Sequence, residues 1–431
     1  MKFTRVFAFM ALAGLAGSAY ATNGYFSHGY GMKAKGMGGA STASSDSAFG
    51  GANNPASMAF AGNRLDLGAD LFSPRREASR TGLGPLDGSV DSDSKYFLIP
   101  EFGYNHMYSP DVALGVTVYG NGGMNTNYSA GQTDLGNCAG GAANGQPGNL
   151  LCGQGKLGVD LMQLIVAPTV AYKIAPSHSI GISPLIGYQR FKAEGLQAFG
   201  TASSDNGNLT NRGYDDSFGY GVRIGYMGKI TPTVSIGAAY ASKMKFDEFD
   251  KYKGLFAEQG GFDIPENYNL GVAWQATPVF LVALDYQRIN YSGVNSINNR
   301  SSNAFIPAPL GADNGPGFGW QDIDVWKLGV EYKYSQQLTL RAGYNHGDNP
   351  IEARDVTFNI LAPGVVKDHA TLGFTYTTAS GNELTMSYMH AFKNDVTGTS
   401  ILPAFGGGAP AGTEKIEMYQ NSLGIQYSWK M

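Results

Sequence analysis

The 431-residue sequence predicts an all-β protein, a transmembrane antiparallel β-barrel of fourteen strands with an N-terminal plug in its lumen. Three observations predict this fold class. Charged residues are 15% of the chain and 61 residues are glycine, whereas soluble proteins average roughly 25% charged residues and about half as much glycine. Aromatic residues reach 12%, too many for a disordered chain. Beyond the N-terminus no apolar run approaches the about 20 residues of a membrane helix, and many short segments alternate apolar with polar residues instead.

The first 21 residues have the three parts of an export signal peptide. Lys2 and Arg5 precede a short apolar stretch, and Ala19-Tyr20-Ala21 fits a small-residue cleavage site. A membrane anchor is the alternative, but the apolar stretch is too short to span a bilayer. We therefore expect cleavage near Ala21 and export to the bacterial outer membrane.

The strands are predicted from a period of two, because successive side chains of a barrel strand face lipid and lumen in turn. In segment 325–334, Trp326 and Leu328 fall on one face, while Lys327 and Glu331 fall on the other. Six short turns alternate with seven long loops, which gives thirteen connections and fourteen strands. An even number of strands puts both chain ends and the short turns on the periplasmic side, and the long loops outside the cell.

The connections set the expected strand ends. The short turns lie at 109–111, 175–179, 231–233, 276–278, 335–337 and 379–382, and the long loops near 73–94, 127–155, 200–213, 246–262, 292–322, 347–367 and 391–413. A soluble β-sandwich is the alternative architecture, but it would not separate short from long connections so strictly. The first strand is expected near Arg64, so that residues 64–431 form the barrel.

Residues 22–63 precede the first strand and are too many for a frayed end. Segment 36–56 consists mostly of small residues that can pack closely, and Asn54-Pro55 is typical of a turn. Fourteen strands enclose a lumen wider than side chains alone can fill. We interpret residues 22–63 as a plug in that lumen, with a disordered periplasmic tail as the alternative.

The same segment resembles a known family. Asp46 in a Gly/Ala/Ser-rich stretch, followed by Asn54-Pro55-Ala56 just before the first strand, is similar to the N-terminal hatch of the FadL/TodX family, outer-membrane transporters of long-chain fatty acids and other hydrophobic compounds. Shorter likenesses follow in order along the chain, at segments 264–266, 338–344, 348–350 and 387–390. The resemblance covers most of the mature chain.

This resemblance implies a monomeric barrel that passes hydrophobic molecules without an energy source. It implies capture in an apolar groove among the extracellular loops, transfer to a site inside the barrel, and sideways exit through a gap made by an inward kink of the third strand, with hatch movement coupling binding to release. The third strand is expected at 111–128, where Gly120, Gly122 and Gly123 weaken its second half. The alternative is that these glycines only begin the next loop.

Candidate groove residues are apolar side chains in or beside polar loops, because exposed apolar clusters tend to mark binding surfaces. They are Leu196, Phe199, Leu255, Phe256, Phe262 and Phe305. The alternative is that these side chains only pack the loops against one another.

A ligand with a carboxylate would need a luminal cation. Arg341 faces the lumen by parity and matches the family's arginine, and Arg190 on the fifth strand is a second candidate. A structural ion pair is the alternative for Arg341. Where fatty-acid transporters of the family have a lysine ahead of the tenth strand, this chain has Gln321 or a neighbour. Fatty acids and neutral hydrocarbons therefore both stay open as ligands.

The remaining motifs exclude other classes of function. Cys138 and Cys152, the two cysteines, lie in one loop of an exported protein and can form a disulfide, whereas a zinc site would need further ligands. The net charge of −4 leaves no basic surface for nucleic acid. No G-x-S-x-G or nucleotide-binding motif is present, so we expect no enzyme, no cofactor and no metal.

The expected partners are hydrophobic small molecules and outer-membrane lipid, including lipopolysaccharide. Two other functions stay open at this stage. One is a general porin for polar solutes, and the other is a surface adhesin or receptor that uses the long loops.

Overall fold

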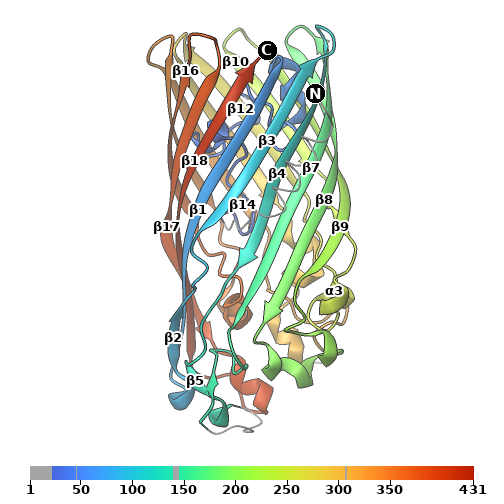
Figure 1. Ribbon diagram of the computed structural model, residues 1–431, viewed down its shortest axis with the longest axis vertical. Helices are drawn as coiled ribbons and strands as arrows, with labels where there is room; N and C mark the ends of the chain where they lie inside the picture. Colours follow the sequence, from blue (N-terminus) through green and yellow to red (C-terminus); the bar gives the residue numbers. More distant parts are fainter. Residues whose placement is uncertain (1–21, 45, 139–144, 306–307) are drawn as a thin grey trace.

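The computed structural model describes residues 22–44, 46–138, 145–305 and 308–431. Within these residues, fourteen antiparallel strands form one closed barrel (Figure 1). Each strand pairs with the next along the chain, and β18 pairs with β1 from Arg64–Lys430 to Thr81–Thr413, which closes the cylinder. The predicted fold class and strand number are confirmed. The expected signal peptide, residues 1–21, lies outside the described residues.

The barrel strands are β1 (Arg64–Thr81), β3 (Phe97–Met107), β4 (Val112–Asn125), β7 (Gly158–Ala175), β8 (His178–Glu194), β9 (Asp215–Lys229), β10 (Val234–Ala241), β12 (Asn267–Thr277), β13 (Phe280–Ile289), β14 (Ile323–Lys333), β15 (Leu338–Gly347), β16 (Asp368–Thr377), β17 (Glu383–Thr399) and β18 (Thr413–Lys430). Four short strands lie among the loops. They are β2 (Gly88–Asp91), which pairs with β1, β11 (Lys245–Phe246), which pairs with β9, and β5 (Thr133–Asp134) and β6 (Pro147–Gly148), which pair with each other.

The helices are all short. The α-helices are α2 (Met32–Lys35), α3 (Ala257–Gly260), α4 (Asn295–Asn298) and α5 (Val356–Asn359). The 3-10 turns are η1 (Pro55–Phe60), η2 (Gly84–Leu86), η3 (Leu135–Asn137), η4 (Gln197–Ala202), η5 (Asn206–Asn208), η6 (Asp250–Tyr252), η7 (Tyr291–Gly293), η8 (Ser301–Phe305), η9 (Ala353–Asp355) and η10 (Leu402–Gly406). In the described part of the chain, no helix combines the length and apolarity of a membrane span.

The two faces of the wall follow the predicted alternation. On β14, Trp326 and Leu328 are exposed outward, whereas Lys327 between them is buried toward the lumen. Near the long-loop end, outward tyrosines hydrogen-bond acids farther along the wall, as Tyr286 donates to Asp324 over 2.7 Å. A tyrosine ring with its hydroxyl bonded to an acid suits a lipid–water boundary, with the ring on the apolar side.

Several strands run beyond the ends that the sequence predicts. A loop is expected from residue 73, but β1 continues to Thr81, and β17 continues to Thr399 where a loop is expected from residue 391. The strands persist because β1, β17 and β18 hydrogen-bond one another over this stretch. Polarity above the lipid boundary therefore indicated exposure to water rather than the end of the strand.

The segment before β1, residues 22–63, lies inside the barrel, and we call it the hatch (Figure 1, blue). Nearly all of its described residues are buried, although it is poor in large apolar side chains. Its small residues allow close approach to the wall. A Cβ on Gly237 of β10, for example, would lie 2.1 Å from the Thr42 carbonyl oxygen.

The loop between β4 and β7 carries both cysteines. Cys138 and Cys152 form a disulfide bond there. The same loop reaches across the barrel mouth, because the Tyr128 hydroxyl donates to the Ile360 carbonyl and the Thr126 hydroxyl to the Leu361 carbonyl. The loops thus cover the long-loop end of the lumen.

Candidate functional site

An apolar cavity of about 40 Å³ lies among the long loops. Five loops contribute its lining: Leu151, Leu196, Phe199, Leu209, Leu255, Phe256, Ser296, Leu310, Pro316, Gly317, Phe318, Phe358 and Leu361. No charged residue lines it, and the one hydroxyl, on Ser296, donates to the Gly261 carbonyl. The cavity therefore has the chemistry to hold a neutral, apolar group.

Four of the six predicted groove residues line this cavity, namely Leu196, Phe199, Leu255 and Phe256. Phe262 does not line it but lies next to it, with its ring centroid 4.9 Å from that of Phe256. The side chain of Phe305 lies outside the described residues.

A column of aromatic rings leads from this cavity to the hatch. Phe262 lies 6.3 Å from Tyr25 between ring centroids, and Tyr25 lies 5.6 Å from Tyr291 and 6.0 Å from Trp320. The Tyr25 N–H donates to the Tyr291 hydroxyl, which donates to the Asn23 carbonyl over 2.6 Å. Burial raises the pKa of Tyr25 well above its usual value, which favours the neutral phenol.

The hatch meets the wall at a β-bulge in β4. Gly120 pairs with Leu164 of β7 and Gly122 with Gln163, so Asn121 is one extra residue in β4. The Asn121 carbonyl accepts hydrogen bonds from the Ser27 N–H and the Tyr30 hydroxyl of the hatch. A bulge bends its strand, and here the bent strand contacts the hatch.

Glycine is required at one of the predicted kink positions. A Cβ on Gly122 would lie only 1.8 Å from the Tyr25 carbonyl oxygen, so the hatch backbone and β4 touch there. Gly120 is the last residue before the bulge, and Gly123 follows it in regular pairing with Met162. The three glycines thus lie in the strand itself rather than in the next loop.

The ladder between β3 and β4 stops beside this bulge. It runs from Met107–Ala113 to Phe102–Val118, whereas β3 continues to Phe97 along β1 and β4 continues to Asn125 along β7. We call the interval beyond the Phe102–Val118 pair the β3–β4 gap. Pro100 of β3 lies at this gap, where the absence of its N–H leaves no ladder bond unmade.

The rest of the hatch is held by charges and caps. Lys35 pairs with Asp70 (2.8 Å) and Glu101 (2.7 Å), all three nearly fully buried. Lys33 pairs with Glu383 (2.9 Å) and with Asp46 (2.7 Å), the predicted acidic residue of the hatch.

The Asn54-Pro55-Ala56 motif begins η1 and attaches it to the wall. The Asn54 side chain accepts from the Ala56 N–H and donates to the carbonyls of Thr42 and Tyr226. Pro55 occupies the first helical position, where no N–H is needed. Asn54 thus joins two parts of the hatch to β9.

The predicted luminal cations lie in other settings. Arg341 faces the lumen but is paired with Glu331 (2.7 Å) and bonded to the Thr375 hydroxyl, so it is a structural ion pair. Arg190 is not luminal, and that prediction is wrong. It is on the outward face of β8, 3.5 Å from the ring centroid of Tyr214, because inward positions of β8 are the odd-numbered ones such as Gln189.

Sequence reasoning missed two other cations, Arg223 of β9 and Lys327 of β14. Both are buried beside a small polar cavity that Tyr30, Asn267, Asn269 and Gln287 also line. Neither forms an ion pair with a described residue. Parity put Lys327 on the luminal face, opposite Asp285 of β13. The lack of an ion pair between them was not predictable, because Asp285 accepts hydrogen bonds from the Ser41 and Thr42 N–H groups of the hatch.

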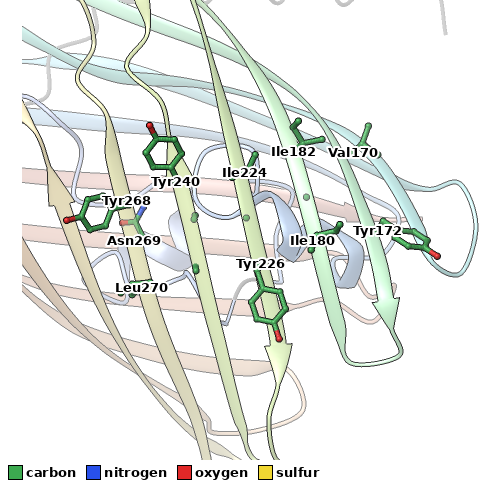
Figure 2. Close-up of a pocket in the computed structure, with 14 residues that line it drawn as sticks. Val170, Tyr172, Ile180, Ile182, Ile224, Tyr226, Tyr240, Tyr268, Asn269 and Leu270 are labelled. Carbon is green, nitrogen blue, oxygen red and sulfur yellow. The ribbon is translucent and has the colours of Figure 1, made fainter. Parts of the chain in front are cut away.

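A larger groove, of about 660 Å³, lies on the lipid-facing surface of β7 to β12 (Figure 2). Ile180, Ile182 and Ile224 surround it and are nearly half exposed. On the luminal side of the same wall, the hatch packs against glycine, since a Cβ on Gly225 would lie 2.0 Å from Asn54 Oδ1. The groove thus lies on the outer face of the wall, and the hatch packs against the inner face of the same strands.

Comparisons with known proteins agree with this architecture. A family model described as outer membrane protein transport protein (OMPP1/FadL/TodX) matches residues 9–402. No curated protein sequence matches the chain.

Several solved structures are similar to the chain. The toluene transporter TodX of Pseudomonas putida is 19% identical, with 94% of this chain and 99% of that chain covered and a TM-score of 0.68. A FadL homologue of Pseudomonas aeruginosa is 15% identical over the same shares, with a TM-score of 0.70. The toluene transporter TbuX of Ralstonia pickettii is 17% identical, again over 94% and 99%, with a TM-score of 0.61. At these identities the likeness shows the fold.

Proposed function

The chain belongs to the OMPP1/FadL/TodX family of outer membrane transport proteins, and from that premise we propose that it is a passive channel that takes up hydrophobic compounds, long-chain fatty acids or hydrocarbons, and releases them sideways at the kinked third strand. The family comprises transport channels. Residues 22–63 act as the hatch, residues 64–431 form the barrel, and the barrel works as a monomer.

One observation carries the proposal. The loop cavity, the aromatic column, the first residues of the hatch and the β4 bulge follow one another in contact, and they end beside the β3–β4 gap. A ligand in the loop cavity would press on Phe256 and Phe262, and through them on Tyr25. Movement of Tyr25 would then relieve the contact of the hatch with Gly122.

This route answers a physical difficulty. Apolar molecules are poorly soluble in water and gain nothing from a wide aqueous pore. An apolar capture site followed by a sideways exit brings the ligand from one apolar surface to another. The filled lumen supports this mechanism over a general porin, because residues 22–63 occupy the space through which polar solutes would pass.

The ligand class follows from two different sites. The loop cavity has no charge and favours neutral hydrocarbons or the tail of a fatty acid. Arg223 and Lys327, near the hatch, offer positive charge to a carboxylate that reaches the lumen. Both ligand classes therefore stay within the proposal, and mass spectrometry of compounds that copurify with the barrel would identify the one carried.

Deletion of Asn121 tests the sideways exit. Removing the one extra residue restores regular pairing of β4 with β7 and straightens the strand, so we expect uptake of radiolabelled toluene by whole cells to fall by at least about tenfold, as for a step whose barrier rises by about 1.4 kcal/mol. Asn121→Ala is the matched control, because it keeps the bulge and the main-chain bonds to the hatch. It loses only two side-chain bonds, the one donated to Gln163 and the longer one accepted from the Tyr30 hydroxyl. Unchanged uptake by a correctly assembled deletion variant would overturn the proposal.

A further inference from the structure

Three arginines face the lumen from β1, and one of them lacks a carboxylate partner. Arg64 pairs with Asp66 and Glu383, and Arg80 pairs with Glu414 over 2.7 Å. Arg76 is 5% exposed and forms no ion pair with any described residue. A buried guanidinium without a counter-ion is costly, so its position needs another explanation.

The contacts of Arg76 all lie at the long-loop end of the β3–β4 gap. One terminal nitrogen donates to the carbonyl of Asn125, the last residue of β4. The other donates to the carbonyl of Ser94, in the segment that leads into β3. The guanidinium also lies 5.8 Å from the ring centroid of Phe97, the first residue of β3. The side chain therefore joins both edges of the gap.

Backbone chemistry explains why a donor is needed there. Where two strands stop pairing, their carbonyl groups face each other without N–H partners, and buried carbonyls need donors. Arginine has five N–H groups in a fixed planar fork, so one side chain can serve two carbonyls on different strands. Backbone bonds continue the junction, since the Asp93 N–H donates to the Asn127 carbonyl over 2.8 Å.

We propose that Arg76 is a positioning residue that sets the width of the β3–β4 gap by bridging its two edges. This inference rests on the proposed sideways exit for its consequence in transport, but the bridging itself is independent of it. Because both acceptors are neutral carbonyls, the bridge is weaker than the ion pairs of Arg64 and Arg80, and it can open when β4 moves. Without it, the upper part of the gap widens and ligand leaves more quickly.

The test measures the gap directly in the full-length barrel. Spin labels at Leu98→Cys on β3 and Leu164→Cys on β7 report the distance from β3 to β7, which spans the gap and β4. The two native cysteines are bonded to each other and do not take label. In Arg76→Met we expect a longer and broader distance distribution. Arg76→Lys, whose ammonium can still donate to both carbonyls, should give an intermediate result and carries the test if the methionine variant does not assemble.

A second readout follows release. Barrels loaded with naphthalene are mixed with empty phosphatidylcholine vesicles, and the loss of bound fluorescence gives the rate. We expect release to be about fivefold faster in Arg76→Met, the factor that corresponds to one ordinary hydrogen bond, with equilibrium binding of naphthalene within about twofold of the parent.

Arg80→Lys is the matched control for Arg76→Lys, because it makes that same change on the same face of β1 away from the gap. It should alter neither the distance nor the rate. A distance distribution and a release rate in Arg76→Met equal to those of the parent would overturn the inference. If the distance shifts while deletion of Asn121 leaves uptake intact, the sideways exit fails and the bridging role of Arg76 stands.

Discussion

Two parts of the hatch, residues 22–30 and residues 31–63, contact the barrel through different kinds of interaction. Residues 22–30 touch the aromatic column and the β4 bulge, with tilted ring contacts and a few hydrogen bonds to main-chain atoms. Residues 31–63 are held by buried ion pairs to β1, β3 and β17 and by the Asn54 cap on β9. Breaking a buried ion pair is far more costly than separating two aromatic rings.

This difference teaches where the hatch can move. Residues 22–30 lie between the loop cavity and the β3–β4 gap, so the less firmly held part of the hatch is next to both ends of the proposed route. Residues 31–63 fix the hatch in the lumen. On the proposed route, a ligand would displace about nine residues rather than the whole hatch, and the lumen would stay closed to polar solutes.

The largest expected effect comes from breaking the buried ion pairs of residues 31–63. Lys35→Met would leave Asp70 and Glu101 buried without a cation, which should lower the free energy of unfolding by about 3–5 kcal/mol. Thermal unfolding followed by gel mobility measures the loss. Lys430→Met is the control, because Lys430 is largely exposed and should contribute almost nothing measurable. Equal losses of unfolding free energy in the two variants would contradict the proposed difference between the two parts of the hatch.

A smaller effect is expected from overpacking the contact between residues 22–30 and β4. Gly122→Ala places a methyl group against the Tyr25 carbonyl, so residues 22–30 or β4 must shift, at a cost of about 1–3 kcal/mol. Hydrogen–deuterium exchange should rise in residues 22–30 and stay unchanged in residues 31–63. Gly68→Ala is the control, since a Cβ there makes only ordinary contacts. An increase spread evenly over the hatch would contradict the prediction.

The smallest expected effect is a pH dependence of local stability in residues 22–30. Burial, and then the nearby His369, Lys35 and Lys327, lower the pKa of His28 well below its usual 6.5. The unfolded segment binds a proton near pH 6.5 and the folded one does not. Stability is therefore complete above about pH 6.5 and falls below it by up to about 1.4 kcal/mol per pH unit.

Exchange at pH 7 and pH 5.5 checks this prediction. Amides of residues 22–30 should exchange faster at pH 5.5, after correction for intrinsic rates, and those of residues 31–63 should change less. His28→Asn should remove the difference. A variant that keeps the same pH dependence would show that another group is responsible.

Local patterns were enough to predict the barrel, because each strand is recognised from its own alternation and its own turns. Trp326, Lys327 and Leu328 lie on the faces that parity predicted. Parity would also have put Arg190 on the outward face with Ile182 and Ile186, so that error came from naming a cation of the fifth strand without checking its face. The extensions of β1 and β17 were not predictable, because a polar strand above the lipid boundary resembles a loop.

The sequence by itself determined the strand number, the alternation of faces and the small-residue segment ahead of the first strand, because these depend on residues close together in the chain. Only the tertiary structure decided which cations are paired, where the β3–β4 ladder ends, and which part of the hatch is firmly held. Those features arise from contacts between residues far apart in the chain, such as Lys35 with Glu101, Tyr25 with Tyr291 and Arg76 with Asn125. A buried charge is costly or harmless according to the partner that the closed barrel brings to it.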